Sequence, residues 1–197
     1  MIKKVKFNKK AKQKIVTFTI NEKIHPFDRD ERYESNIEKF LSKNKYGEIV
    51  NIGTLQFANG EIEFFDISIL IYNNFDFKKV INELIYKFEE LGAPKGSYLT
   101  IEETNIDINF GQKEGLGIYL DGINLPPNVY RDCDINYVIE KIRQLIKDED
   151  EILRYWEGNE VTALYFYGDS FERMKNNILN FINTNPLCQN TKLIQIA

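Results

Sequence analysis

A possible catalytic pair is formed by His25, the only histidine of the 197-residue chain, and Asp28 three positions later. Histidine titrates near neutral pH, and a neighbouring carboxylate can orient its ring as a general base. The chain has no Gly-x-Ser-x-Gly motif to supply a matching nucleophile. We therefore favour a structural interpretation, in which Pro26 fixes the backbone and Asp28 or Asp30 caps the helix that follows. An enzyme that uses His25 with Asp28 or Asp121 is the least favoured alternative.

The glycines between Gly115 and Gly122 (GLGIYLDG) invite comparison with a nucleotide-binding loop. A dinucleotide-binding fingerprint follows a strand and opens a helix. Here the glycines instead precede and follow a predicted strand over residues 116–120. We therefore interpret Asp121-Gly122 as a turn.

No metal site or cofactor is predicted. The densest acidic run, Asp148-Glu149-Asp150-Glu151, lacks the glycine and the alternating oxygen ligands of a calcium loop. Cys133 and Cys188 do not form a Cys-x-x-Cys pair and indicate neither a zinc site nor a disulfide framework.

A cytoplasmic location is predicted from the same two cysteines, because a chain without a disulfide framework suits a reducing compartment. The longest apolar runs, residues 67–72 and 163–167, are far shorter than the roughly 20 residues that cross a bilayer. The N-terminus has no apolar signal core. We expect a soluble protein that does not bind membranes.

Charge is unevenly distributed along the chain. The first 14 residues hold seven lysines and no acid, which leaves 19 basic and 30 acidic residues from Ile15 onward, a formal charge of −11. Nucleic-acid binding needs basic stripes on the folded surface, so we expect no nucleic-acid partner. An acidic body would attract a basic protein partner. The alternative is that the excess acid only keeps the protein soluble.

Aromatic residues suggest where such a partner would bind, because tyrosine and tryptophan are enriched in protein interfaces. Tyr165 and Tyr167 share one face of a predicted strand, which is either a functional surface or, as we favour, a half-buried sheet face with satisfied hydroxyls. The predicted partner-binding residues are Asp148, Glu149, Asp150, Glu151, Tyr155, Trp156 and Glu157.

The first half of the chain reads as strand, helix, two strands, helix, strand. Alternating residues predict strands over 14–20, 48–57, 61–72 and 97–102, and helical spacing is found over 32–41 and after Asp76. Asn59-Gly60 is a hairpin signal, and Gly92 followed by Pro94 ends the second helix.

The second half repeats this order. Strands are predicted over 116–120, 151–157, 160–168 and 192–196, with helices capped by Asp134 and by Asp169 or Ser170. Gly158-Asn159 is expected to supply the positive φ angles of a tight hairpin. The second helix is expected to end near Asn185-Pro186.

This internal repeat predicts an α+β fold with two ferredoxin-like βαββαβ units, whose antiparallel sheets pack into one compact protein. Residues 1–13 form a basic arm or a first strand, 14–103 the first unit, 104–114 a short connection and 115–197 the second unit. Each unit has helices on one face of its sheet, so we expect the remaining faces to bury surface between the halves. Either a monomer or a homodimer is compatible with exposed edge strands.

Four strings carry a resemblance to a known group of proteins: residues 25–34 (HPFDRDERYE), 92–97 (GAPKGS), 115–122 (GLGIYLDG) and 186–190 (PLCQN). From about residue 15 to its end, the chain resembles immunity proteins, which are encoded near bacterial polymorphic or contact-dependent toxins. The resemblance implies direct binding and neutralisation of a cognate toxin, without catalysis.

We therefore expect a non-enzymatic immunity-type protein whose acidic, aromatic surface masks a toxin. A basic nuclease would fit the role of that toxin. The alternative is a tandem ferredoxin-like regulatory module that binds a small metabolite between its halves, with the glycine loops at 92–96 and 115–122 close to the ligand.

Overall fold

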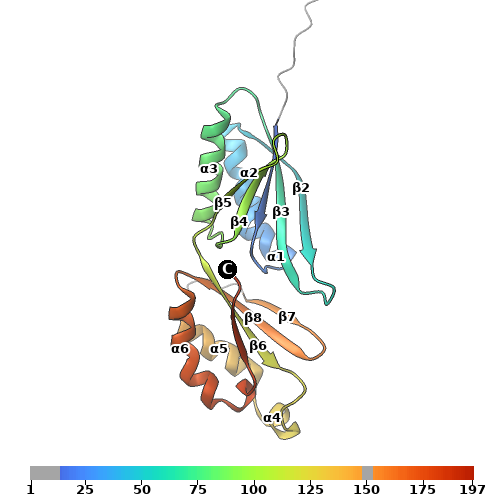
Figure 1. The fold of residues 1–197 in the computed structure, drawn as a ribbon, viewed down its shortest axis with the longest axis vertical. Helices are drawn as coiled ribbons and strands as arrows, with labels where there is room; N and C mark the ends of the chain where they lie inside the picture. Colours follow the sequence, from blue (N-terminus) through green and yellow to red (C-terminus); the bar gives the residue numbers. More distant parts are fainter. Residues whose placement is uncertain (1–13, 148–152) are drawn as a thin grey trace, which may run out of the picture.

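The computed structural model describes residues 14–147 and 153–197 and shows a mixed α+β protein. Five strands form one antiparallel sheet and four strands form a second, with helices packed on each (Figure 1). The α+β class and the antiparallel sheets predicted from the sequence are thus confirmed. No helix among the described residues is long and apolar enough to cross a membrane.

The first half contains nine elements. They are β1 (Lys14–Ile20), α1 (Pro26–Arg29), the π-helical turn η1 (Asp30–Glu34), α2 (Ser35–Asn44), β2 (Gly47–Gln56), β3 (Ile62–Ile71), α3 (Phe77–Glu90), β4 (Ser97–Ile101) and β5 (Ile106–Phe110). The sheet order is β2-β3-β1-β4-β5. The short strand β5 pairs with β4 inside residues 104–114, where the sequence predicted only a connection.

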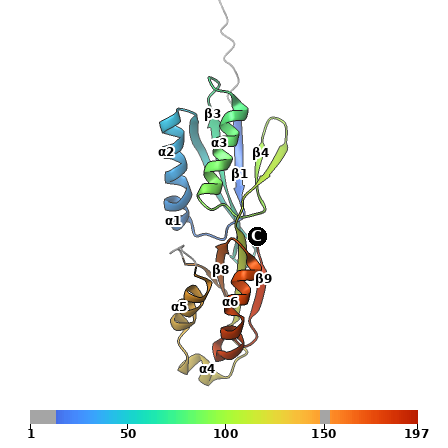
Figure 2. The same cartoon turned by 90° about the vertical axis from the view of Figure 1, so that its left-hand side faces the viewer.

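The helices cover one face of this sheet because the strands alternate. Val16, Phe18 and Ile20 of β1 are fully buried under α2 and α3, and the ring of Phe18 stacks on Phe88 of α3 with centroids 4.4 Å apart. Burial of one such side chain contributes roughly 1.5–3 kcal/mol. Figure 2 shows both helices on the same side of the sheet.

The predicted start of the first helix was wrong. The helical segment begins at Pro26, and His25, not Asp28 or Asp30, occupies the N-cap position without a side-chain cap. Proline suits the first helical turn because its missing N–H group would have no partner there. The later boundaries are confirmed: Asp76 accepts hydrogen bonds from the first turn of α3, and Gly92 follows its end with a φ of 89°.

The second half contains eight elements. They are β6 (Glu114–Asp121), α4 (Pro127–Asp132), α5 (Ile135–Ile146), β7 (Arg154–Glu157), β8 (Val161–Gly168), α6 (Phe171–Thr184), the 3-10 turn η2 (Pro186–Cys188) and β9 (Lys192–Gln195). The sheet order is β7-β8-β6-β9. Asp134 caps α5 and Ser170 caps α6, as the sequence predicted.

One turn was predicted for the wrong reason. Neither Gly158 nor Asn159 of the β7–β8 hairpin has a positive φ angle. Glycine at 158 leaves room for the indole ring of Trp156, because a Cβ atom there would lie 2.3 Å from the ring and would displace it. The glycine in this hairpin therefore reflects the space that the Trp156 ring needs and not a positive φ angle.

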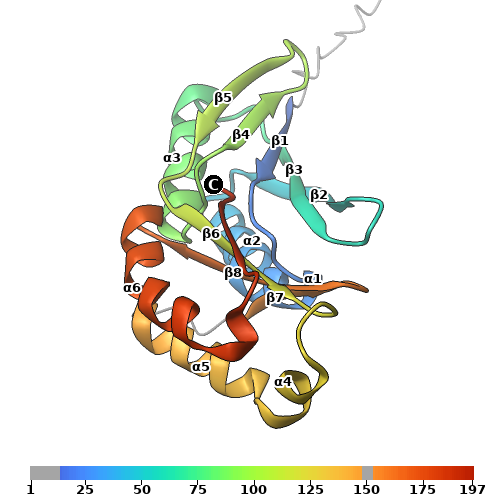
Figure 3. The ribbon, with the colours of Figure 1, turned by 60° about the horizontal axis from the view of Figure 1, so that its bottom comes forward.

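The two halves share one strand arrangement. When the strands of each half are numbered from its start, both sheets have the order 2-3-1-4, and β5 is an additional edge strand of the first. The halves meet at one end of the first sheet, where the helix-free face of the second sheet turns towards the first half (Figure 3).

Candidate functional site

A buried ion pair joins the two halves. Glu22, in the loop after β1, accepts a hydrogen bond of 2.6 Å from Arg154 of β7, and the two side chains are 0% and 1% exposed. Tyr33 donates its hydroxyl to the second oxygen of Glu22, and burial, followed by the charge of Glu22, raises the pKa of Tyr33. Separating the halves would take Glu22 from Arg154 and leave the carboxylate only the more distant Arg32 of its own half, at 3.6 Å. Breaking a buried ion pair is costly in an apolar environment.

A second polar cluster surrounds Glu61 at the start of β3. The hydroxyls of Tyr165 and Tyr119 donate to the same carboxylate oxygen at 2.8 and 3.0 Å, and the Lys23 ammonium lies 2.9 Å from it. Burial by itself raises the pKa of Glu61, but the hydrogen bonds from Lys23, Tyr165 and Tyr119 together lower it below the ordinary value. Tyr167 accepts the backbone N–H of Lys23 at 2.9 Å.

Tyr165 and Tyr167 are therefore structural residues. Both are buried, and both hydroxyls are hydrogen-bonded across the boundary between the halves. The interpretation favoured from the sequence, a sheet face with satisfied hydroxyls, is confirmed. Gly115 makes room for this packing, since a Cβ atom there would lie 2.7 Å from Ile196 and 3.0 Å from the ring of Tyr167.

Beside these clusters a shallow groove of about 140 Å³ runs between the β2–β3 hairpin and β7. Its lining residues are Lys23, His25, Gln56, Gly60, Ile62, Tyr155, Trp156, Glu157 and Tyr165. A neighbouring hollow of about 170 Å³ is lined by His25, Asp28, Leu153, Arg154 and Tyr155. Three segments distant in sequence thus form one surface.

Large apolar side chains are exposed on the segments that line these two hollows. Phe27 of α1 is 83% exposed, Tyr155 of β7 57%, and Leu55 and Phe57 at the β2–β3 hairpin 47% and 45%. We refer to Phe27, Leu55, Phe57, Tyr155, Trp156 and Glu157 as the seam surface. Exposed aromatic residues grouped at a concave rim are typical of interfaces.

Three predicted partner-binding residues belong to the seam surface. Tyr155 and Glu157 are exposed, and Trp156 is half-buried against the β7–β8 hairpin. The other four, Asp148, Glu149, Asp150 and Glu151, lie outside the described residues. Sequence reasoning did not include Phe27, Leu55 or Phe57, although two apolar residues flanking a hairpin turn were a usable signal.

The residues of the enzyme alternative, His25, Asp28 and Asp121, do not form a catalytic site within the described part of the chain. His25 is exposed and lines the same hollow as Asp28, and no hydrogen bond between them is found among the described residues. Asp121 accepts the backbone N–H groups of Ile123 and Asn124, which hold its pKa at about 2. Its carboxylate therefore fixes the loop after β6. Within residues 14–147 and 153–197, no group of acids, cysteines and histidine is arranged to hold a metal ion.

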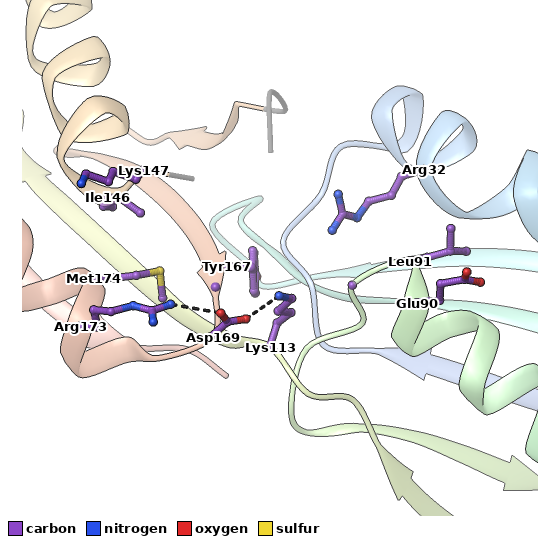
Figure 4. Close-up of a pocket in the computed structure, with 12 residues that line it drawn as sticks. Arg32, Glu90, Leu91, Lys113, Ile146, Lys147, Tyr167, Asp169, Arg173 and Met174 are labelled. Carbon is purple, nitrogen blue, oxygen red and sulfur yellow. Dashed lines mark hydrogen bonds and ion pairs between the residues drawn. The ribbon is translucent and has the colours of Figure 1, made fainter. Parts of the chain in front are cut away.

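A cavity of about 630 Å³ lies between the halves (Figure 4). Four cations line it, Arg32, Lys113, Lys147 and Arg173, each from a different part of the chain. Asp169 already accepts from Lys113 at 2.6 Å and from Arg173 at 3.2 Å. Of the predicted metabolite-binding glycines only Gly92 lines this cavity.

The comparison with models of known protein families finds no match to this chain, and no curated protein matches it.

Proposed function

We propose that this protein is a non-enzymatic immunity-type protein that binds a cognate bacterial toxin through the seam surface and so neutralises it. The observation that carries the proposal is the group of exposed apolar side chains around the groove, contributed by both halves. Rigid aromatic anchors of this kind supply much of the binding energy of a protein interface.

The chemistry of the seam surface supports a basic partner. Asp28 and Glu157 line its two hollows, while the cations there, Lys23 and Arg154, are already paired with Glu61 and Glu22. The described surface lies on a body of formal charge −11 from Ile15 onward. Such a charge speeds the encounter with a basic protein and makes the association rate sensitive to salt.

The buried pairs between the halves support a preorganised surface. Phe27 and Tyr155 come from different halves, and the Glu22–Arg154 pair fixes the backbone near both. A surface that is ordered before binding loses less conformational freedom in the complex.

The test is co-expression with the adjacent gene product, followed by affinity purification and a growth assay. We expect a stable complex and rescue of growth by the wild-type protein. Tyr155→Ala combined with Phe27→Ala should weaken binding by at least about tenfold, the effect of losing two interface anchors. Tyr86→Ala, a control on α3 where the ring is 69% exposed, should bind as the wild type does. No complex at low or physiological salt would refute the proposal.

We further propose that each half is a ferredoxin-like βαββαβ unit. The 2-3-1-4 strand order of both sheets and the placement of the helices on one face of each support this assignment. Backbone contacts between strands, measured by NMR on the full chain, test it, since the assignment predicts the pairing order 2-3-1-4 in each half.

The cavity between the halves favours a second candidate function, the binding of a small anionic metabolite. Its volume suits a metabolite, and its lining carries four cations against Glu90 and Asp169. It ranks second because two of the cations, Lys113 and Arg173, already donate hydrogen bonds to Asp169. A thermal-shift screen of phosphates and carboxylates separates the two functions: a rise in Tm that Lys113→Ala abolishes supports the metabolite.

A further inference from the structure

The first sheet has a helix-free face that no other element of residues 14–147 and 153–197 covers. Both α2 and α3 pack on its opposite face, and the second half meets the sheet only at its end (Figure 2). Cross-strand register identifies the residues of this open face. They are Ile15, Thr17 and Thr19 of β1, Glu48, Asn51, Gly53 and Leu55 of β2, Phe64, Asp66, Ser68 and Leu70 of β3, Tyr98 and Thr100 of β4, Glu102 just after it, and Asp107 and Asn109 of β5.

All charged groups of the open face are acidic. They are Glu48, Asp66, Glu102 and Asp107. Among the residues that form the five strands of this sheet, Lys14 is the only basic one. Its ammonium lies on the helix side, 4.3 Å from the ring centroid of Phe77 of α3. The sheet therefore separates charge, with carboxylates on the side that lacks helices.

Hydroxyl groups hold three of these four carboxylates in place. Thr19 donates to Asp66 at 2.6 Å, Thr100 to Asp107 at 2.7 Å, and Thr17 to Glu102 at 3.2 Å. Each carboxylate has two oxygens and several lone pairs, so it retains acceptor capacity after this bond. The spacing of the acids is thus fixed by the sheet and not by mobile side chains.

From its carboxylates and its lack of covering helices, we infer that the open face is a docking surface for a lysine- or arginine-rich segment of the partner protein. The inference rests on the proposed function for the identity of the partner. Leu55 of the open face directly precedes Gln56, which lines the groove beside the seam surface, so the two areas adjoin along β2. The open face of a second copy would be repelled, because it would bring the same four acids, and a nucleic acid would be repelled through its phosphates.

The test first uses a decalysine peptide as a defined probe. Amide chemical shifts should move on the five strands of the first sheet at low salt, and the shifts should diminish as salt rises. Combining Glu48→Lys, Glu102→Lys and Asp107→Lys should weaken binding by at least about tenfold. The control combines Glu38→Lys, Glu140→Lys and Glu172→Lys, exposed helix residues with the same total charge change, and should weaken binding far less. Shifts that map elsewhere, or an equal loss in both variants, would overturn the inference.

The same two variants are then tested against the co-expressed toxin. Weaker binding by the open-face variant alone supports the inference in full. Equal binding by wild type, open-face variant and control would overturn it while the proposed function stands. If the wild type binds no toxin but the peptide maps to the open face, the proposed function fails and the docking surface for a basic segment remains.

Discussion

The helix-free faces of the two sheets are built on the same strand order but have opposite roles. On the first sheet this face carries threonines and carboxylates and is uncovered by the other described residues. On the second sheet it carries Ala163, Tyr165 and Tyr167, which are buried against the first half. Strand topology thus decides which residues share a face, whereas side-chain chemistry decides whether that face can be buried.

The buried face shows why polar groups are tolerated there. Its tyrosines combine a large apolar ring with one hydroxyl, and each hydroxyl named here has a partner across the boundary. Burial of an aromatic ring then stabilises the junction without leaving a hydrogen-bond donor unpaired. The open face has a charged group on most strands, and removing these from water would cost more than its few apolar residues return.

The largest effect is expected from the ion pair behind the buried face. Arg154→Met should lower the free energy of unfolding by as much as about 3–5 kcal/mol, because it removes the closer of two arginines from the buried Glu22 carboxylate and leaves only Arg32, 3.6 Å away. Chemical denaturation measures this change. Arg131→Met removes an exposed pair with Asp132 and should have little effect. Similar losses in both variants would contradict the comparison.

Glycines on the two faces should respond with opposite signs. Gly115→Ala on the second sheet should destabilise the protein by about 1–3 kcal/mol, because the new methyl group meets Ile196 and Tyr167. Gly53→Ala on the open face meets no atom within 4 Å and should be neutral or slightly stabilising. Thermal unfolding of both variants decides the matter, and a destabilised Gly53→Ala would show that the open face is covered.

Removing a tyrosine hydroxyl should cost more stability on the buried face than on the open face. Tyr165→Phe takes one hydrogen bond from Glu61 and should cost about 1–2 kcal/mol, since the carboxylate is buried. Tyr98→Phe on the open face should cost less, because water can reach a half-buried side chain there. Urea denaturation of the pair tests this, and equal costs would argue against a difference in burial between the two tyrosines.

The smallest effect concerns acid sensitivity. The pKa of Glu61 is lower in the folded protein than its ordinary value of 4.5. The folded state therefore favours the ionised form, and this contribution to stability is fully present above about pH 4.5 and is lost as the pH falls through the folded pKa. Glu61→Gln should flatten that part of a stability profile recorded from pH 7 to pH 3. Asp66→Asn, its counterpart on the open face, is the control, and identical profiles for wild type and Glu61→Gln would exclude Glu61 as a source.

Much of the fold followed from local patterns. Alternation and capping residues located the main strands and helices. The predicted hairpin forms at Asn59-Gly60 with a φ of 86° at Gly60, but its loop is longer than two residues, since Phe57 pairs with Glu61. The strand β5 was missed, although Ile106, Ile108 and Phe110 alternate with polar residues, because five residues in a polar stretch are a weak signal. The π-helical turn η1 gives no pattern of its own in the sequence.

The candidate site was only partly predictable. Tyr155 and Glu157 were chosen for residue type and lie in the seam surface, but Phe27, Leu55 and Phe57 join them only through folding. The four cations of the large cavity come from separate elements, and no spacing relates them.

The sequence by itself determined the α+β class, the repeat of strand and helix order, and the alternation that assigns residues to opposite sheet faces, because these depend on neighbours within a few positions. Tertiary structure alone decided which face was buried and which charges met. Glu22 and Arg154 are 132 positions apart, and Glu61 and Tyr165 are 104 apart. A chain with 26 basic and 30 acidic residues offers many such pairings, and only the packing of the two halves selects one.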